Sequence, residues 1–196
     1  MSCGPKATEL VQIVGQTMAE AQAKGGPWIV CRPGCAECCL GTFAISQSDA
    51  ERLQHGLEQL SVQDPSRAAR VRQRARAFLD RFASSFPGHP DSGLLDDSPE
   101  GQERFETFGE DVPCPALDPA SQTCDLYPYR PVTCRTFGPA IRYPEGEIRA
   151  CELCYQDATE QEIAAAAVPL APVHLREIQE AHTIAAWALA GRPRRF

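Results

Sequence analysis

The distribution of cysteine constrains this chain more than any other feature of its sequence. Four of its 10 cysteines fall within "CRPGCAECC" at residues 31–39, five lie between residues 114 and 154, and residues 40–113 contain none. Packing alone does not require such clustering, because a free cysteine packs singly as a small apolar side chain. The two sets therefore indicate that the fold brings thiols together for a chemical purpose.

The expected redox state of these thiols follows from the rest of the chain. The N-terminal segment has no uninterrupted apolar stretch and no A-x-A cleavage site, and no stretch approaches the roughly 18 apolar residues of a membrane span. We therefore expect a cytoplasmic protein without membrane association, in which thiols stay reduced. Reduced, clustered cysteines favour metal ligation, whereas disulfides would need an oxidising compartment. The net charge of −7 argues against a nucleic-acid partner.

The cysteine spacings are typical of metal-binding loops. Cys31, Cys35 and Cys38 read C-x-x-x-C-x-x-C, and "CELC" ends the second set. Such short spacings let two thiolates turn toward one ion while backbone amides hydrogen-bond the sulfurs. The first pattern is also used by enzymes that hold a [4Fe–4S] cluster at three irons, although this chain is too short for their barrel. The side chains of adjacent Cys38 and Cys39 tend to diverge, so the number of sites, one or two, stays open.

The candidate metal ligands are all the cysteines except Cys3. They are Cys31, Cys35, Cys38, Cys39, Cys114, Cys124, Cys134, Cys151 and Cys154. Cys3 precedes the first predicted helix, and we expect it not to ligate. Arg130 and Arg135 are predicted to bind the cofactor, by donating to sulfur or balancing the charge of a four-thiolate site. Arg142 and Arg149 are further candidates, and the alternative is that these arginines are solvated.

Four segments together resemble a known family. "CRPGCAECC", "CPALD" and "CDLYPYRPVTCRTFG", followed by a final cysteine, look like the YkgJ-type cysteine-cluster family, or CxxCxxCC domain, over about residues 31–154. The resemblance implies zinc or iron chelation by eight cysteines. Seven fall on Cys31, Cys35, Cys38, Cys39, Cys114, Cys124 and Cys134, and the eighth is Cys151 or Cys154. A flagellin lysine methylase carries a similar module, believed to bind an iron–sulfur cluster, which implies a possible activity by analogy only.

The remaining sequence predicts a mostly α-helical fold. Apolar periodicity and capping residues predict helices over residues 8–24, 46–60, 64–82, 98–108, 159–167 and 172–190, and a β-hairpin pairs 141–143 with 148–150. Seven prolines between Pro113 and Pro144 predict an irregular cysteine-rich layer. We expect one domain over residues 1–196, with a metal-binding core at about 31–154. The arginines of residues 64–82 are expected to form a solvated face.

The sequence assigns no catalytic residue. It lacks G-x-G-x-x-G, a P-loop, G-x-S-x-G and H-E-x-x-H, and His182 is expected on an apolar helical face rather than in a site. Three functions remain: a metalloprotein holding an iron–sulfur cluster (4Fe-4S) or zinc, a cluster-dependent enzyme related to the flagellin lysine methylase, and a metal chelator or delivery protein. Thiolate ligands suit zinc and iron–sulfur about equally. The C-x-x-x-C-x-x-C spacing and the ninth cysteine favour [4Fe–4S].

Overall fold

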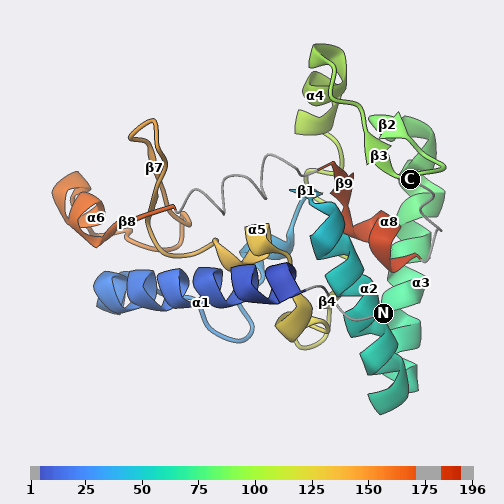
Figure 1. The fold of residues 1–196 in the computed structure, drawn as a ribbon, viewed down its shortest axis with the longest axis horizontal. Helices are drawn as coiled ribbons and strands as arrows, with labels where there is room; N and C mark the ends of the chain where they lie inside the picture. The colour runs from blue at the N-terminus through green and yellow to red at the C-terminus, as the bar shows by residue number, and fades with distance from the viewer. Residues whose placement is uncertain (1–4, 171–181, 191–196) are drawn as a thin grey trace. The chain divides into compact units, whose positions relative to one another are not determined.

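The computed structural model describes residues 5–170 and 182–190, and it is mostly α-helical with small two- and three-stranded sheets, as predicted (Figure 1). Contacts divide these residues into two compact units. The first unit comprises Gly34–Pro131 and residues 182–190, and the second comprises residues 5–33 and 132–170. No helix within the described ranges is long and apolar enough to cross a bilayer.

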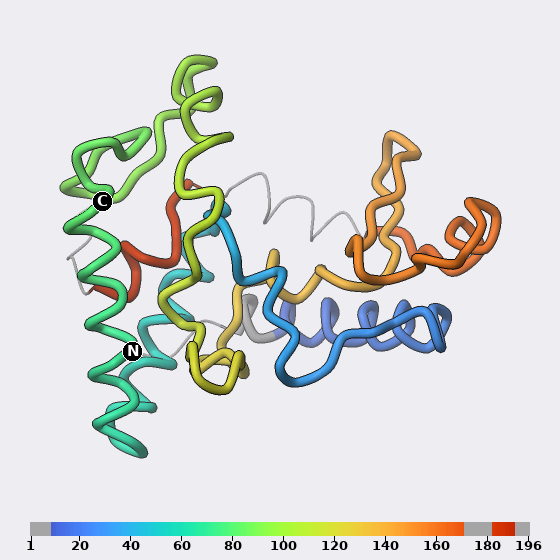
Figure 2. Tube along the Cα trace, turned by 180° about the vertical axis from the view of Figure 1, so that it is seen from behind, coloured from blue at the N-terminus to red at the C-terminus, as the bar shows by residue number. Residues whose placement is uncertain are grey.

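The first unit is built on helices α2, α3 and α8, which pack on one another. They span Gln47–Gln63, Pro65–Phe82 and Ala185–Leu189. The helices α2 and α3 lie side by side in both views (Figures 1 and 2). Asp64 alone separates them: it ends α2 and its carboxylate accepts from the Arg67 amide at the start of α3. Ser46 caps α2 in the same way through the Asp49 amide, so both predicted helix starts are confirmed.

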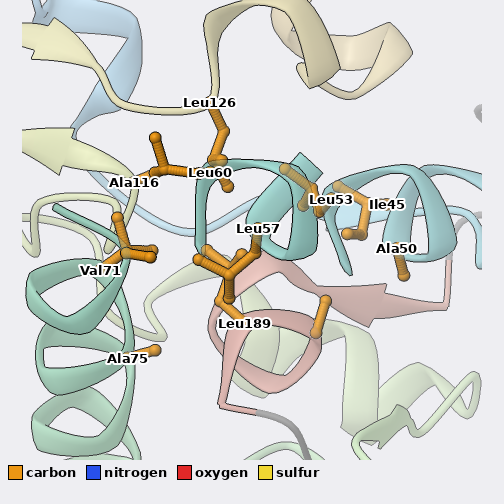
Figure 3. Packing of buried hydrophobic residues seen from close by; sticks show 12 residues of the cluster. Ile45, Ala50, Leu53, Leu57, Leu60, Val71, Ala75, Ala116, Leu126 and Leu189 are labelled. Atoms are coloured by element: carbon orange, nitrogen blue, oxygen red, sulfur yellow. The ribbon is translucent and has the colours of Figure 1, made fainter. Parts of the chain in front are cut away.

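The core of this unit lies between the predicted apolar faces of α2 and α3. Leu53, Leu57 and Leu60 of α2 are buried, as are Val71 and Ala75 of α3 (Figure 3). Ala116 and Leu126, which flank two of the cysteines, and Leu189 of α8 complete this cluster. A second cluster is aromatic: Trp187 stacks on Phe86 at 4.0 Å between ring centroids, and its indole donates to the Pro90 carbonyl at 2.7 Å.

The predicted last helix is wrong between His182 and Ile184. Thr183–Ile184 forms strand β9, which pairs antiparallel with β1 (Ala44–Ile45), and α8 begins only at Ala185. His182 precedes this strand, and its amide donates to Ile45 while its carbonyl accepts from Leu95, so it occupies no helical face. β-Branched Thr and Ile favour the extended backbone. The part of the predicted helix before His182 lies outside the described residues.

The rest of the first unit consists of short elements. These are η2 (Glu37–Cys39), η3 (Ala83–Ser85), β2 (Gly88–His89), β3 (Leu94–Leu95), α4 (Pro99–Glu106), β4 (Leu117–Asp118), β5 (Thr123–Cys124) and η4 (Tyr127–Tyr129). The short helix predicted near residue 98 is confirmed as α4, whose cap is Ser98. The β2–β3 and β4–β5 hairpins were not predicted, because each strand has only two residues and carries no alternating pattern.

The second unit is organised along helix α1. Its elements are α1 (Pro5–Gly25), η1 (Gly26–Trp28), α5 (Val132–Arg135), β6 (Ile141–Arg142), β7 (Ile148–Arg149), α6 (Glu160–Ala166) and β8 (Val168–Pro169). The predicted β6–β7 hairpin is confirmed, and β8 adds a parallel strand to it. Val14 of α1 packs on Val132 of α5, and Ala21 packs on Ile141 and Val168. The predicted Thr159–Glu162 capping box starts α6.

We expect the α2 face to be required for the stability of the first unit. Leu53 is 2% exposed within the core, so Leu53→Ala should lower the free energy of unfolding by about 2–5 kcal/mol. Val62→Ala on the same helix is the matched control, because Val62 is 82% exposed and should change stability by under about 0.5 kcal/mol. Urea denaturation followed by circular dichroism measures both, and equal effects would contradict this core assignment.

Candidate metal centre

Three backbone segments of the first unit bring four cysteines together. Cys38 and Cys39 lie in the 3₁₀ turn η2, and the chain leaving this turn meets Pro113 through an antiparallel bridge at Leu40. The Cys114 amide donates to the Cys39 carbonyl at 2.7 Å. These backbone bonds place the end of the first cysteine set beside the beginning of the second, although the cysteine-free residues 40–113 separate the two sets in the sequence.

The β4–β5 hairpin adds the fourth thiol. Cys124 pairs with Leu117 across the hairpin, and the Leu117 amide donates to the Cys114 carbonyl at 2.9 Å. Cys114 and Cys124 both pack, half-buried, against the apolar core of α2 and α3. The sequence predicted that the fold would join the two cysteine sets, and within this unit it joins Cys38 and Cys39 to Cys114 and Cys124.

The four thiols interact electrostatically with one another, and Arg130 acts on two of them, Cys38 and Cys124. A hydrogen bond with the Cys39 thiol lowers the pKa of Cys38, and the Arg130 charge lowers it further. The pKa of Cys39 is raised by the same hydrogen bond, by burial and by the neighbouring Cys38, Cys114 and Cys124. Cys38 is therefore the thiol of this pair that favours the thiolate form, which is the form that binds metal.

Burial opposes ionisation at the other two thiols. It raises the pKa of Cys114 to about 11, and it raises the pKa of Cys124 above its ordinary value although Arg130 acts in the opposite direction. Both groups hold their protons at neutral pH, so a metal that binds them has to displace protons.

Arg130 is the predicted cofactor-binding residue whose charge acts on this set. Its guanidinium stacks on the Tyr127 ring, 3.6 Å from the centroid, and its charge acts on Cys38 and Cys124. Arg142 donates instead to the Ala164 carbonyl at 2.8 Å, and Arg149 pairs with Glu147, so these two have structural partners. Arg135 lies in α5 of the second unit, beside Cys134.

A buried carboxylate, which the sequence did not single out, anchors this set of thiols to helix α3. The Asp125 side chain is 2% exposed and binds Arg67 and Arg74, the latter at 2.5 Å. Arg74 also donates to the Pro115 carbonyl at 2.8 Å, next to Cys114. The prediction of a solvated arginine face is therefore wrong at Arg67 and Arg74. The available signal was their seven-residue spacing, which places both on one helical face.

The second unit holds a separate set of cysteines: Cys31, Cys134, Cys151 and Cys154. The Cys154 amide donates to the Cys151 carbonyl at 2.9 Å, and their thiols are hydrogen-bonded. Cys154 is 4% exposed and packs in a cluster with Tyr155 and Ala140. Burial, together with Cys154, raises the pKa of Cys151. Cys35 lies half-buried in the first unit, and Cys3 lies outside the described residues.

The donor set fits a soft metal by its chemistry. In the part of the chain that the structure describes, no three His, Cys, Asp or Glu side chains lie close enough together to ligate one ion. Four cysteine thiols nevertheless interact within the first unit, and thiolates are the ligands of structural zinc and of iron–sulfur clusters.

Comparison with known proteins gives one match. The family model CxxCxxCC, described as a "putative zinc- or iron-chelating domain", matches residues 30–167, which include all nine candidate ligands. No curated protein and no solved structure matches the chain significantly.

We expect the Asp125 ion pairs to hold Cys114 and Cys124 in place. Asp125→Asn removes the charge that Arg67 and Arg74 share, and should lower the free energy of unfolding by about 1.5–3 kcal/mol and weaken metal binding about 10–100-fold. Arg74→Ala should act in the same direction. The control is Arg70→Ala, since Arg70 is exposed and lies one turn before Arg74 on α3. Unchanged zinc affinity in Asp125→Asn would contradict this role.

Metal affinity should rise with pH. The raised pKa values of Cys114 and Cys124 mean that protons compete with the metal at neutral pH, and raising the pH removes this competition. The apparent zinc affinity should increase by about tenfold per pH unit for each proton displaced between about pH 6 and pH 8. Competition titrations against a chromophoric chelator measure it. An affinity independent of pH would show that the buried thiols are not ligands.

Proposed function

The chain belongs to the CxxCxxCC family, which is described as a "putative zinc- or iron-chelating domain", and we propose that its clustered thiolates hold an iron–sulfur cluster or zinc. The proposed first centre comprises Cys38, Cys39, Cys114 and Cys124, with Arg130 as the charge-balancing residue. The observation that carries this proposal is the mutual interaction of four thiols from three segments of one compact unit.

A set of four thiolates closes the coordination sphere of a metal. Closed Cys₄ sites are typical of structural zinc and of iron–sulfur clusters, whereas catalytic zinc keeps one open position. We therefore favour a structural or electron-carrying centre over a site that binds substrate. A cluster-dependent activity like that of the flagellin lysine methylase, and a role as a metal chelator or delivery protein, are the alternatives.

The choice between the two metals rests on the spacing of the first set. The C-x-x-x-C-x-x-C pattern and the surplus cysteine favour [4Fe–4S] over zinc for the chain as a whole, but only Cys38 of that pattern belongs to the proposed first centre, so metal analysis decides between the two metals there. Arg130 suits either, because zinc with four thiolates and an oxidised [4Fe–4S] cluster with four thiolates both carry a net negative charge. We expect this protein to work in the cytoplasm, where reduced thiols are free to ligate, and to use neither nucleic acid nor a membrane as its partner.

Anaerobic purification with metal analysis and a visible spectrum tests the proposal. We expect iron and acid-labile sulfide with broad visible absorption that dithionite bleaches; zinc without colour would select the zinc form. Cys124→Ser and Cys39→Ser should each lose metal. They should also lower the melting temperature sharply, because a structural thiolate site supplies about 10–16 kcal/mol of apparent binding energy.

The control for this experiment is Cys3→Ser, which should keep the metal content and stability of the wild type. Wild-type metal content in both Cys124→Ser and Cys39→Ser would exclude the proposed centre. Metal loss from Cys3→Ser would show that the N-terminus supplies a ligand and that the proposed set is wrong.

A further inference from the structure

Cys31 belongs to a different unit from the other cysteines of "CRPGCAECC". The two compact units divide this stretch between Pro33 and Gly34, which leaves Cys31 with residues 132–170 and places Cys35, Cys38 and Cys39 with residues 34–131. The question is what Cys31 does within its own unit.

Gly138 connects Cys31 to the "CELC" turn. A Cβ atom built at Gly138 would lie 2.8 Å from Cys31 Sγ, so the sulfur occupies the space that any other residue would fill. Gly138 also has φ +111°, and its carbonyl accepts from the Cys151 amide at 3.0 Å. At Gly138, the absence of a side chain thus leaves room for the Cys31 sulfur, and the backbone carbonyl holds the Cys151 amide in place.

The "CELC" turn supplies two more thiols that lie close together. The Cys154 amide donates to the Cys151 carbonyl, which closes a tight turn, and the two thiols are hydrogen-bonded to each other. Trp28, Ile29 and Tyr155 pack in the same apolar cluster as Cys151 and Cys154. Such a layer shields bound thiolates from water and from exchange. Cys134 lies on α5 of the same unit, four residues before Gly138.

From this arrangement we propose that the second unit holds its own thiolate centre for a soft divalent cation of the zinc class, with Cys31, Cys151 and Cys154 as ligands and Cys134 as the fourth. The chain then carries two centres, one in each unit. The inference rests on the proposed function for its metal chemistry, but it concerns different residues. Ligation replaces the Cys151–Cys154 hydrogen bond and releases the thiol protons.

Titration of the metal-free, reduced full-length chain with Co²⁺ alone tests the number of centres, because thiolate ligation of Co²⁺ gives an intense visible absorption. We expect two equivalents for the wild type. A Cys151→Ser/Cys154→Ser variant should retain one equivalent at the first unit, and a Cys38→Ser/Cys114→Ser variant should retain one at the second. Circular dichroism checks that each variant keeps its helices.

The outcomes separate the two proposals. Wild-type stoichiometry in Cys151→Ser/Cys154→Ser would overturn the second centre and leave the first intact. Wild-type stoichiometry in Cys38→Ser/Cys114→Ser would overturn the proposed first centre alone. Loss of all Co²⁺ binding in both variants would show one shared site and overturn the two-centre inference.

Two glycine substitutions test the placement of Cys31 without removing a thiol. Gly138→Ala should weaken Co²⁺ binding at the second centre at least about tenfold, because the added methyl group displaces Cys31 Sγ. Gly146→Ala is the matched control: its φ of +93° brings similar backbone strain, but nothing lies within 4 Å of the added Cβ. Equal Co²⁺ affinities for the two variants would overturn the placement of Cys31 in this centre.

Discussion

The ion pairs of Asp125 with Arg67 and Arg74 are the constraint on which the thiol arrangement of the first unit depends. A carboxylate buried to this degree is stable only when cations satisfy it, and both cations come from helix α3. Since Asp125 follows Cys124 directly and Arg74 also binds the Pro115 carbonyl, the same contacts hold both cysteines of the hairpin region. Helix α3 thereby fixes the position of the proline-rich segment that carries both cysteines.

Burial and ligation act together in this unit. Packing Cys114 and Cys124 against the α2–α3 core keeps these thiols protonated, whereas Arg130 and the hydrogen bond with Cys39 favour the Cys38 thiolate. These effects favour the thiolate at Cys38 and the neutral thiol at Cys39, Cys114 and Cys124. In the proposed centre, a cation would bind Cys38 first and displace protons from the other three thiols.

Whether a structural feature could be predicted from the sequence depends on whether the residues that determine it lie close together in the chain. Capping by Ser46, Asp64 and Thr159 and the apolar faces of their helices act within a few residues, so the predicted helix starts are confirmed. The strand at Thr183–Ile184 could not be read in this way, because its partner lies near residue 44. The same holds for Asp125, whose arginine partners are more than 50 residues away. The candidate cysteine ligands could be identified from the sequence, but they could not be assigned to one unit or the other.

The pairing of β9 with β1 has a consequence for synthesis of the chain. Strand β9 and helix α8 come long after α2 and α3 in the chain, yet Leu189 packs in the cluster of α2 and α3 and Trp187 packs against Phe78 and Leu79 of α3. During translation the two helices emerge with their apolar faces uncovered, and every cysteine leaves the ribosome before the segment that closes this core. Until β9 and α8 have been synthesised, the apolar surface that they cover stays exposed, so we expect chaperones that bind apolar surface to associate with the nascent chain.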